Sequence, residues 1–263
     1  LPLCLALAGC LEQGLVLRDR EQPESAITRA DQLAAGPYHS CALRSGELRC
    51  WGANESGQLG LGDTTDRTLP EAVAGSDWVE IVAGEQHSCA RRTAGSLWCW
   101  GENDQGQLGV GFGPPSPLPV FVSTQAPVVQ LAATYHHTCA IDDAGALFCW
   151  GANEEGQLAQ DDPFTGEGVD RPTPVRVGTG NEWLVADAGQ GHTCAIESPG
   201  KLHCWGRNLR GELGLGPGSP GQIRTPQLVA GPADWRDVRI GQNSSCGLRQ
   251  DDTLHCWGGN DFG

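Results

Sequence analysis

Hydrophobic and polar residues alternate in short runs that recur along the chain about every 50 residues. Three such runs are WVEIVAG from Trp78, WLVADAG from Trp183 and WRDVRIG from Trp235, and each has the period of two that is typical of a half-buried strand. A cysteine-flanked segment, a glycine-rich block and a proline-containing apolar stretch follow in the same order. The pattern predicts units of four short strands separated by Gly or Pro turns.

The cysteine-flanked segments define the repeat most clearly. They read CALRSGELRCWG, CARRTAGSLWCWG, CAIDDAGALFCWG, CAIESPGKLHCWG and CGLRQDDTLHCWG, and they begin at Cys41, Cys89, Cys139, Cys194 and Cys246, with spacings of 48, 50, 55 and 52 residues. Four of them are followed by GQLGLG from Gly57, GQLGVG from Gly106, GQLAQD from Gly156 and GELGLG from Gly211. A period of this length indicates a repeat protein, and a four-stranded unit is typical of a β-propeller blade.

The cysteine spacing also predicts the hairpin in each unit. If Cys41 lies opposite Cys50, the residues between them pair down to a two-residue turn at Ser45-Gly46. The second, third and fourth units have one residue more, which predicts three-residue turns. These turns end in Gly95, Gly145 and Gly200, and glycine suits the left-handed position of a bulged turn.

Five disulfide bonds follow from this register, because directly opposed residues of an antiparallel pair have Cα atoms about 4.5 Å apart, close to what a disulfide tolerates. The predicted pairs are Cys41 with Cys50, Cys89 with Cys99, Cys139 with Cys149, Cys194 with Cys204, and Cys246 with Cys256. Zinc is the rival interpretation, but zinc sites favour cysteines separated by two to four residues, and here eight or nine intervene. We therefore expect no metal and no cofactor on these cysteines.

The recurring GEQHSCA, CWG and GQLGLG motifs resemble the regulator of chromosome condensation repeat over about residues 31–263. This resemblance implies an all-β propeller of four-stranded blades of about 50 residues, which closes with seven blades in that family. Five repeats are present, and the fifth stops at CWGGNDFG, before its glycine block. We expect a fragment of a seven-bladed propeller, with a self-contained five-bladed ring as the alternative. Paired cysteines are a feature of the secreted bacterial members.

The first ten residues, LPLCLALAGC, form an apolar run that is similar to the end of a signal peptide. The segment from Leu7 to Cys10 resembles the bacterial lipobox, which implies a lipid on Cys10 and a mature chain that starts there. Leu11 in the next position implies sorting to the outer membrane. Residues 11–30 are interpreted as a tether or a partial blade. The alternative is that the apolar run is a chance decamer.

The formal net charge is −15, so the electrostatic field around the protein repels phosphate backbones and anionic lipids. We therefore expect no nucleic-acid partner, and membrane contact only through the lipid anchor. A basic or small polar partner suits this charge better. Twelve cysteines also indicate an oxidising, extracytoplasmic compartment.

Two residue types recur at fixed places in the repeat. His39, His87, His137 and His192 each stand two positions before the first cysteine, where the fifth unit has Ser244. We predict that these histidines tie neighbouring strands together; a ring of metal sites is the alternative, but the disulfides would remove the thiolates that it needs.

Tryptophan follows the second cysteine of every unit, at Trp51, Trp100, Trp150, Trp205 and Trp257, and is predicted to pack between blades. A second set, Trp78, Trp183 and Trp235, begins the apolar runs, and Val128 replaces it in the third unit. We interpret that replacement as ordinary variation of a packing position.

Variable loops are the candidates for binding, because binding residues in repeat proteins lie on loops that need not repeat. The stretch from Gly111 to Pro119 is rich in proline and contains Phe112, whereas the stretch from Asp161 to Asp170 is an acidic insertion. Asp161, Asp162 and Phe164 are its candidate binding residues. A Ca²⁺ site there is conceivable, but the full ligand pattern is missing.

The sequence contains no serine nucleophile elbow, no phosphate-binding glycine loop and no helical pair of metal-ligating histidines. We therefore predict a non-enzymatic scaffold of the cell envelope, or a secreted one, that binds a protein or a glycan. One alternative is a guanine-nucleotide exchange factor for a small GTPase, as in the nuclear relatives. The other is an inhibitor of a secreted enzyme.

Overall fold

The computed structural model describes residues 30–160 and 168–260, and within them the chain forms five antiparallel sheets and no helix. Blades 1 to 4 each contain four strands that pair in chain order, and blade 5 contains three within the described residues. This architecture confirms the predicted all-β propeller of four-stranded blades. No helix of the described residues is both long and apolar enough to cross a membrane.

The strands have the following bounds. Blade 1 consists of β1 (Gln32–Ala35), β2 (His39–Arg44), β3 (Glu47–Gly52) and β4 (Arg67–Ala72), and blade 2 of β5 (Trp78–Ala83), β6 (His87–Arg92), β7 (Leu97–Gly101) and β8 (Ser116–Val122). Blade 3 consists of β9 (Val128–Thr134), β10 (His137–Asp142), β11 (Leu147–Gly151) and β12 (Arg171–Arg176), and blade 4 of β13 (Trp183–Ala188), β14 (His192–Glu197), β15 (Lys201–Arg207) and β16 (Gln222–Leu228). Blade 5 consists of β17 (Trp235–Ile240), β18 (Ser244–Arg249) and β19 (Leu254–Gly258).

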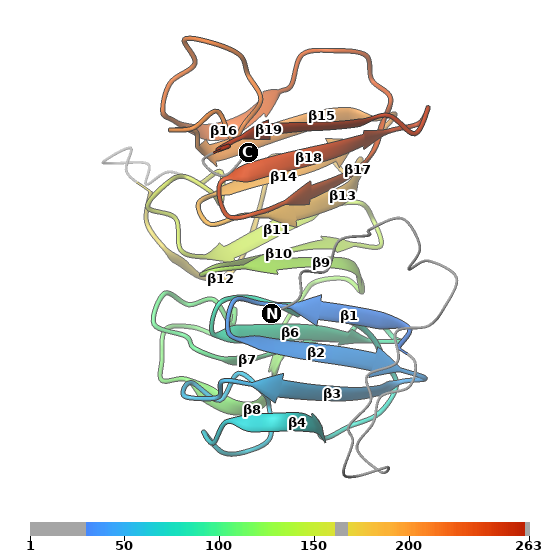
Figure 1. Cartoon of the computed structure of the whole chain (residues 1–263), viewed down its shortest axis with the longest axis vertical. Helices are drawn as coiled ribbons and strands as arrows, with labels where there is room; N and C mark the ends of the chain where they lie inside the picture. The colour runs from blue at the N-terminus through green and yellow to red at the C-terminus, as the bar shows by residue number, and fades with distance from the viewer. Residues whose placement is uncertain (1–29, 161–167, 261–263) are drawn as a thin grey trace, which may run out of the picture.

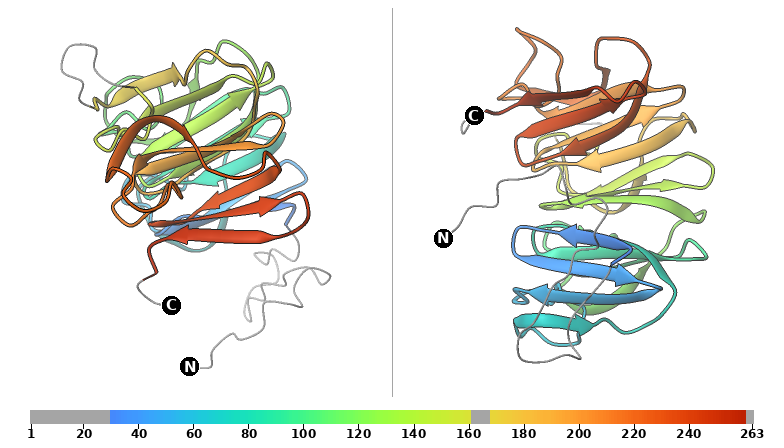
Figure 2. Two further views of the ribbon diagram at one scale, coloured as in Figure 1. Left: turned by 90° about the horizontal axis from the view of Figure 1, so that it is seen from above. Right: turned by 45° about the vertical axis from the view of Figure 1, so that its right-hand side comes forward.

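The blades follow one another around an arc, with blade 1 at one end and blade 5 at the other (Figures 1 and 2). The first strand of each blade is innermost, and these inner strands contact one another from blade to blade. The last strand of blades 1 to 4 is an outer edge that contains proline, as in TLPEA, SPLPVF, RPTPV and RTPQL. Proline removes a backbone donor, so these edges are poor templates for pairing with another strand.

The predicted hairpins lie between the two middle strands of each blade. Cys41 faces Cys50 in the register, and the turn residues Ser45 and Gly46 have φ values of 50° and 82°, as a tight two-residue turn requires. Gly95 and Gly145 are left-handed, with φ of 79° and 77°. Gly200 differs, because its φ of 136° lies outside the left-handed helical region. The prediction of a left-handed bulged turn is therefore wrong for the fourth unit.

All five predicted cysteine pairs are bonded, with Cα–Cα distances of 4.1 Å. Each disulfide crosses a middle hairpin, and in blades 1 to 4 both sulfur-bearing residues are fully buried. The hydrophobic core lies between successive sheets. In the core between blades 1 and 2, for example, Leu59 and Cys50 of blade 1 pack with Trp78, Ile81 and Trp100 of blade 2. The blades therefore depend on one another for their cores.

Candidate interaction face

The antiparallel order of the strands places two kinds of loop at the same end of every blade. The first kind joins the inner strand to the second strand and spans residues 36–38, 84–86, 135–136, 189–191 and 241–243. The second kind joins the third strand to the outer strand and spans residues 53–66, 102–115, 152–160 with 168–170, and 208–221. We call these segments together the loop face, and the opposite end, with the tight turns between the middle strands, the hairpin face.

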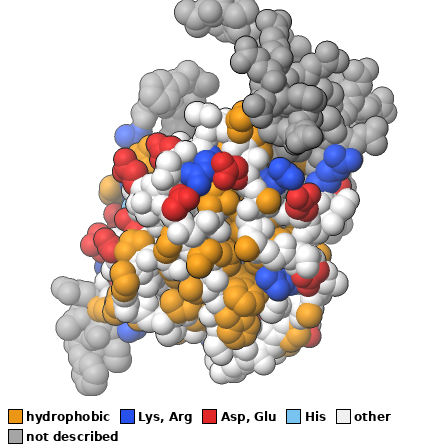
Figure 3. All heavy atoms as spheres, turned by 90° about the horizontal axis from the view of Figure 1, so that it is seen from below, with side chains coloured by type: hydrophobic (Ala, Val, Ile, Leu, Met, Phe, Trp, Pro, Cys, Tyr) orange, Lys and Arg blue, Asp and Glu red, His pale blue; other side chains and the backbone are white. Residues whose placement is uncertain are grey.

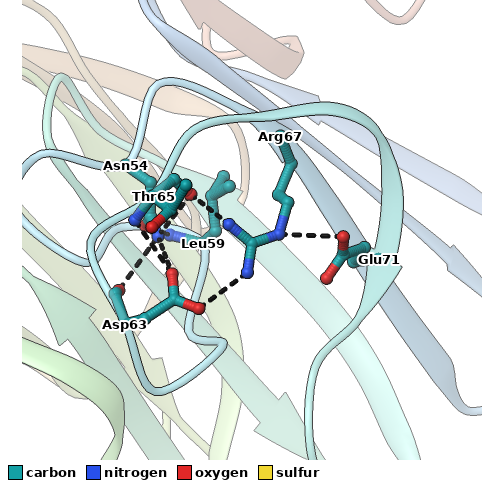
Figure 4. A network of polar contacts seen from close by, with 6 residues as sticks. All are labelled: Asn54, Leu59, Asp63, Thr65, Arg67 and Glu71. Carbon is teal, nitrogen blue, oxygen red and sulfur yellow. Dashed lines mark hydrogen bonds and ion pairs between the residues drawn. The ribbon is translucent and has the colours of Figure 1, made fainter.

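A buried asparagine shapes each long loop of the loop face. In blade 1 the Asn54 side chain accepts a hydrogen bond from the Leu59 amide at 2.9 Å and donates to the Asp63 and Thr65 carbonyls at 2.9 and 3.0 Å (Figure 4). Arg67 then joins the loop to its outer strand by ion pairs with Asp63 at 2.7 Å and Glu71 at 2.8 Å. Asn103, Asn153 and Asn208 accept the equivalent amide bond in blades 2 to 4. Sequence reasoning missed this residue, although it recurs two places after each CWG.

The glycine-rich block of each loop is fixed to the next blade. The Gln58 carbonyl in blade 1 accepts a hydrogen bond from the Ser88 hydroxyl at 2.9 Å and another from the Trp100 indole at 2.8 Å, both in blade 2. The carbonyls of Gln107, Gln157 and Glu212 repeat this double contact with blades 3, 4 and 5. Trp100, Trp150 and Trp205 therefore lie buried between blades as predicted, whereas Trp51 of blade 1 and Trp257 of blade 5 are only partly buried.

The recurring histidines complete the same junctions. His39 Nε2 lies 2.7 Å from the Ser88 hydroxyl, and His87, His137 and His192 make the equivalent contact at 2.9, 3.0 and 2.9 Å. Because each hydroxyl already donates to a glutamine or glutamate carbonyl, its oxygen accepts from the histidine N–H. Burial lowers the pKa of His39 to about 4 and that of the other three to about 3, so all four are neutral near pH 7. Their role is structural.

A different histidine on the loop face contacts two carboxylates. His136 Nε2 lies 3.0 Å from Glu85 Oε2, and its Nδ1 lies 3.5 Å from Glu102 Oε2. The contact with Glu102 raises the pKa of His136, burial lowers it, and the charge of Glu85 raises it again. The net result is a pKa above the ordinary value. The two carboxylates contact different nitrogens of the ring. Across the described residues, no group of three or more His, Cys, Asp or Glu side chains could hold a metal ion.

Blades 4 and 5 carry a cationic counterpart of this cluster. Arg207 forms an ion pair with buried Glu212 at 3.3 Å and donates to the side-chain oxygens of Gln190 at 3.3 Å and Asn243 at 2.7 Å. Arg207 and Glu102 occupy the same position in their repeats, directly after CWG. The loop face therefore keeps one framework while the charge at an equivalent position differs between blades.

Exposed residues directly after the framework asparagines contribute negative charge to the loop face. Glu55, Asp104 and Glu154 occupy this position in blades 1, 2 and 3, and all three are exposed. Blade 4 has Leu209 in the same place, and its side chain is 71% exposed. This exposed position is therefore acidic in blades 1 to 3, where we call it the acidic row, and apolar in blade 4.

The inner strands surround a central hollow of about 800 Å³. Side chains bridge neighbouring inner strands there: Gln32 exchanges two hydrogen bonds with the Ile81 backbone, and Gln130 does the same with Ala186. Asp187 accepts from the Ile240 amide at 2.8 Å, and burial raises the pKa of its carboxyl to about 6. The polar side chains of Gln32, Gln130 and Asp187 therefore already form hydrogen bonds with a neighbouring blade.

The predicted binding residues divide into two groups. Phe112 lies in the second long loop of the loop face with 62% of its surface exposed, as a binding residue requires. Asp161, Asp162 and Phe164, and the candidate lipidation site Cys10, lie outside the described residues. Sequence reasoning did not find the His136 and Arg207 clusters, because their partners come from separate blades.

A second surface with apolar character lies on the outer strands of blades 1 and 2. Seen from below, hydrophobic side chains gather on this end of the molecule (Figure 3). Leu69 of β4 and Leu118 and Phe121 of β8 are 40, 50 and 53% exposed. Phe121 is partly covered, because it packs edge-to-face on Trp98 with ring centroids 5.5 Å apart.

The family model of the RCC1-like domain matches residues 9–263. The chain belongs to the RCC1-like domain family. The recurring motifs that resemble the regulator of chromosome condensation repeat therefore identify the family correctly, and its five sheets are blades of that propeller.

Named relatives agree with this assignment. The ultraviolet-B receptor UVR8 of Arabidopsis thaliana is 32% identical over 238 residues, which make up 88% of this chain and 53% of that protein. Among solved structures, human WBSCR16 is similar with a TM-score of 0.76 and 22% identity, over 88% of this chain and 62% of that one. Yeast RCC1 (Prp20), in its complex with Kap60, is similar with a TM-score of 0.75 and 25% identity, over 88% and 56%. The chain spans about half the length of UVR8.

Proposed function

We propose that this chain is part of an exported, disulfide-stabilised propeller that binds another protein or a glycan through its loop face. The observation that carries the proposal is the combination of one hydrogen-bonded framework with unlike charges at equivalent repeat positions, as in Glu102 and Arg207 directly after CWG. The Asn and His hydrogen bonds hold the loops in place, so the variable side chains can be presented with little loss of entropy on binding.

The printed titles of related structures are consistent with protein binding. One describes yeast RCC1 bound to Kap60, and another describes the binding properties of Prp20p to Gsp1p and histones. These statements concern those proteins. For this chain, the net charge of −15 and the acidic row of Glu55, Asp104 and Glu154 favour a partner with a basic surface.

The five disulfides support export. A protein kept in a reducing cytosol gains little from buried disulfides, whereas disulfides persist in oxidising compartments outside the cytoplasm. We further propose that the protein is anchored by a lipid on Cys10 or is secreted. The resemblance of the segment ending at Cys10 to a lipobox supports the anchor, and membrane contact would come only from that lipid.

Guanine-nucleotide exchange on a small GTPase is the second candidate, because the RCC1-like fold is shared with yeast RCC1. The disulfides count against it, since such GTPases and their nucleotide are cytosolic. Inhibition of a secreted enzyme is compatible with the same loop face and is the third candidate. We propose no catalytic function, because the polar clusters of the loop face are closed by their own ion pairs.

A pair of charge-matched triple variants tests the loop-face proposal. The variant E55Q/D104N/E154Q removes three exposed carboxylates from the loop face, and E47Q/D143N/E182Q removes three from the hairpin end of the blades. Both are immobilised under oxidising conditions and exposed to envelope and culture-supernatant proteins and glycans of the producing cells. We expect the loop-face variant to lose the ligands that the wild-type protein and the control retain.

Equal capture by the two variants would contradict the loop-face proposal. A parallel assay measures nucleotide release from small GTPases of the same cells. Acceleration of release by the oxidised protein would favour the exchange-factor alternative over an exported scaffold.

A further inference from the structure

Blade 3 lacks a tryptophan that three other blades share. Trp78, Trp183 and Trp235 are buried first residues of β5, β13 and β17, and β9 begins instead with Val128. The strand registers align these positions, because Trp78 pairs with Arg92, Trp183 with Glu197, Trp235 with Arg249 and Val128 with Asp142.

In the three tryptophan-containing blades the indole packs against other rings. Its centroid lies 6.2, 6.2 and 5.9 Å from Trp100, Trp205 and Trp257, respectively. In blades 4 and 5 it also meets His203 and His255 edge-to-face, with centroids 5.5 and 5.6 Å apart. Blade 3 keeps both neighbouring rings, as Trp150 and Phe148, but has no indole beside them.

The place of the missing indole is a pocket of about 90 Å³. Val128, Ala140, Phe148, Trp150 and Pro174 form apolar walls, and Ser123, Thr124 and Gln125 add polar groups. Neighbouring side chains have not closed over the space that the extra atoms of a tryptophan would fill. Wall atoms of an unfilled space lose their dispersion contacts, so a ligand of matching shape restores them.

The charge beside the pocket is opposite to that in blades 2 and 5. In blades 2 and 5 an arginine covers the indole, with Arg92 Cζ 4.5 Å from the Trp78 centroid and Arg249 Cζ 4.2 Å from the Trp235 centroid. Asp142 stands at this position in blade 3 and lines the pocket. Its Oδ1 accepts from the Ala144 and Ala146 amides at 3.0 and 2.8 Å, which fixes the carboxylate in place.

We propose that this pocket is a binding site for a small aromatic amine. The ring takes the place of the missing indole beside Trp150 and Phe148, where stacked or edge-to-face geometry is favoured. The ammonium group pairs with the Asp142 carboxylate, and a partly buried pair of this kind is stronger than a neutral hydrogen bond. A closed apolar cavity of about 150 Å³ accepts benzene. This pocket is smaller, at about 90 Å³, and is open to solvent on one side, so it suits a single ring that is only partly enclosed.

The test uses three probes with one ring and different charge: 2-phenylethylamine, 2-phenylethanol and 3-phenylpropionate. Each is titrated into the oxidised protein, and binding is followed by the NMR signal of the Trp150 indole N–H. We expect 2-phenylethylamine to bind about tenfold more tightly than 3-phenylpropionate, with the alcohol between them. In D142N, which keeps the turn acceptor but removes the charge, this difference should fall below about twofold.

Filling the pocket with the protein's own indole provides the decisive variant. V128W should abolish binding of all three probes, whereas V79W, which places a tryptophan on the exposed neighbouring position of blade 2, should bind as the wild type does. If V128W fails to fold, V128A serves instead, because the enlarged pocket should bind 2-phenylethylamine at least as tightly as the wild type. Unchanged binding by folded V128W, loss of binding by V128A, or an equal response to the three probes would overturn the proposal. None of these results depends on the loop-face proposal.

Discussion

Single buried histidines link each blade to the next, and their chemistry explains why they recur. A neutral imidazole donates to a Ser or Thr hydroxyl of the following blade, and that hydroxyl donates to a glutamine or glutamate carbonyl of the preceding one. Both partners are buried, so removal of either leaves a polar group without its bond. The junction therefore contributes to blade order as well as to stability.

Removal of one such histidine should be strongly destabilising. His137 is fully buried, so H137A leaves a cavity and removes the donor to Thr193. We expect a loss of about 2–4 kcal/mol in the free energy of unfolding. E55A, at an exposed residue of blade 1, is the control and should change it by less than about 0.5 kcal/mol. Denaturant unfolding of the oxidised proteins measures the free energy of unfolding of both variants. An equal loss of stability in H137A and in the control would contradict the assigned role of His137.

Acid should destabilise the fold through the same residues. The folded pKa values of His39, His87, His137 and His192, about 4 and about 3, lie below the ordinary value of 6.5, so the unfolded chain binds more protons below pH 6.5. Each histidine therefore lowers the free energy of unfolding by up to about 1.4 kcal/mol per pH unit as pH falls from 6.5 towards 4.

Asp187, His136 and Asp170 act in the opposite direction, because their folded pKa values are raised. They are fewer than the four histidines together with His203, whose folded pKa is also lowered. We expect net destabilisation from pH 7 to pH 4.5 in denaturant titrations. The H137A variant should show a shallower slope than the wild type, by about 1.4 kcal/mol per pH unit. A stability that is independent of pH in this range would contradict the assignment.

The sequence predicted the structural role of these histidines but not their partners. The partners of the described contacts lie between 49 and 56 residues away, and only the rotation of one blade against the next brings them together. Val128 is a buried packing position as predicted, but the sequence did not indicate the pocket beside its smaller side chain. Sequence alone cannot tell whether neighbouring side chains will fill such a space.

At the scale of strands and hairpins, the disulfides staple the two middle strands of each blade. The register could be predicted from the sequence, because a strand has a period of two and the number of residues between two opposed cysteines fixes the turn length. The exception at Gly200 shows that spacing fixes the length of a turn but not its backbone geometry. The loop framework built on Asn54 depends on contacts within a long irregular loop, which periodicity does not describe.

Removal of one staple should destabilise its blade without changing its register. The variant C139S/C149S opens a loop of ten residues in blade 3. The chain-entropy estimate for such a loop is about 2–3 kcal/mol, and we expect a decrease of that size or less in the free energy of unfolding. Thermal unfolding of the oxidised variant, with the oxidised wild-type protein as reference, measures it. An unchanged melting temperature would contradict a stabilising role for the bond.

For the whole molecule, the repeats determine the architecture. Five units with one motif order could be recognised as propeller blades from the sequence, because each unit buries its faces only against its neighbours. The curvature of the arc and the width of the central hollow could not, since they follow from side-chain packing between sheets. Nor could the loop-face clusters at His136 and Arg207, whose members come from different units.

We propose that this chain is part of an exported, disulfide-stapled binding propeller. The most direct test is the intact mass of the protein expressed from its complete gene in its native cells and purified under thiol-blocking conditions, with and without reduction. We predict that the ten cysteines from Cys41 to Cys256 resist alkylation until reduction, which frees ten thiols, and that Cys10 carries a lipid. Free thiols before reduction together with a lipid-free Cys10 would contradict export and favour a cytosolic regulator of a small GTPase.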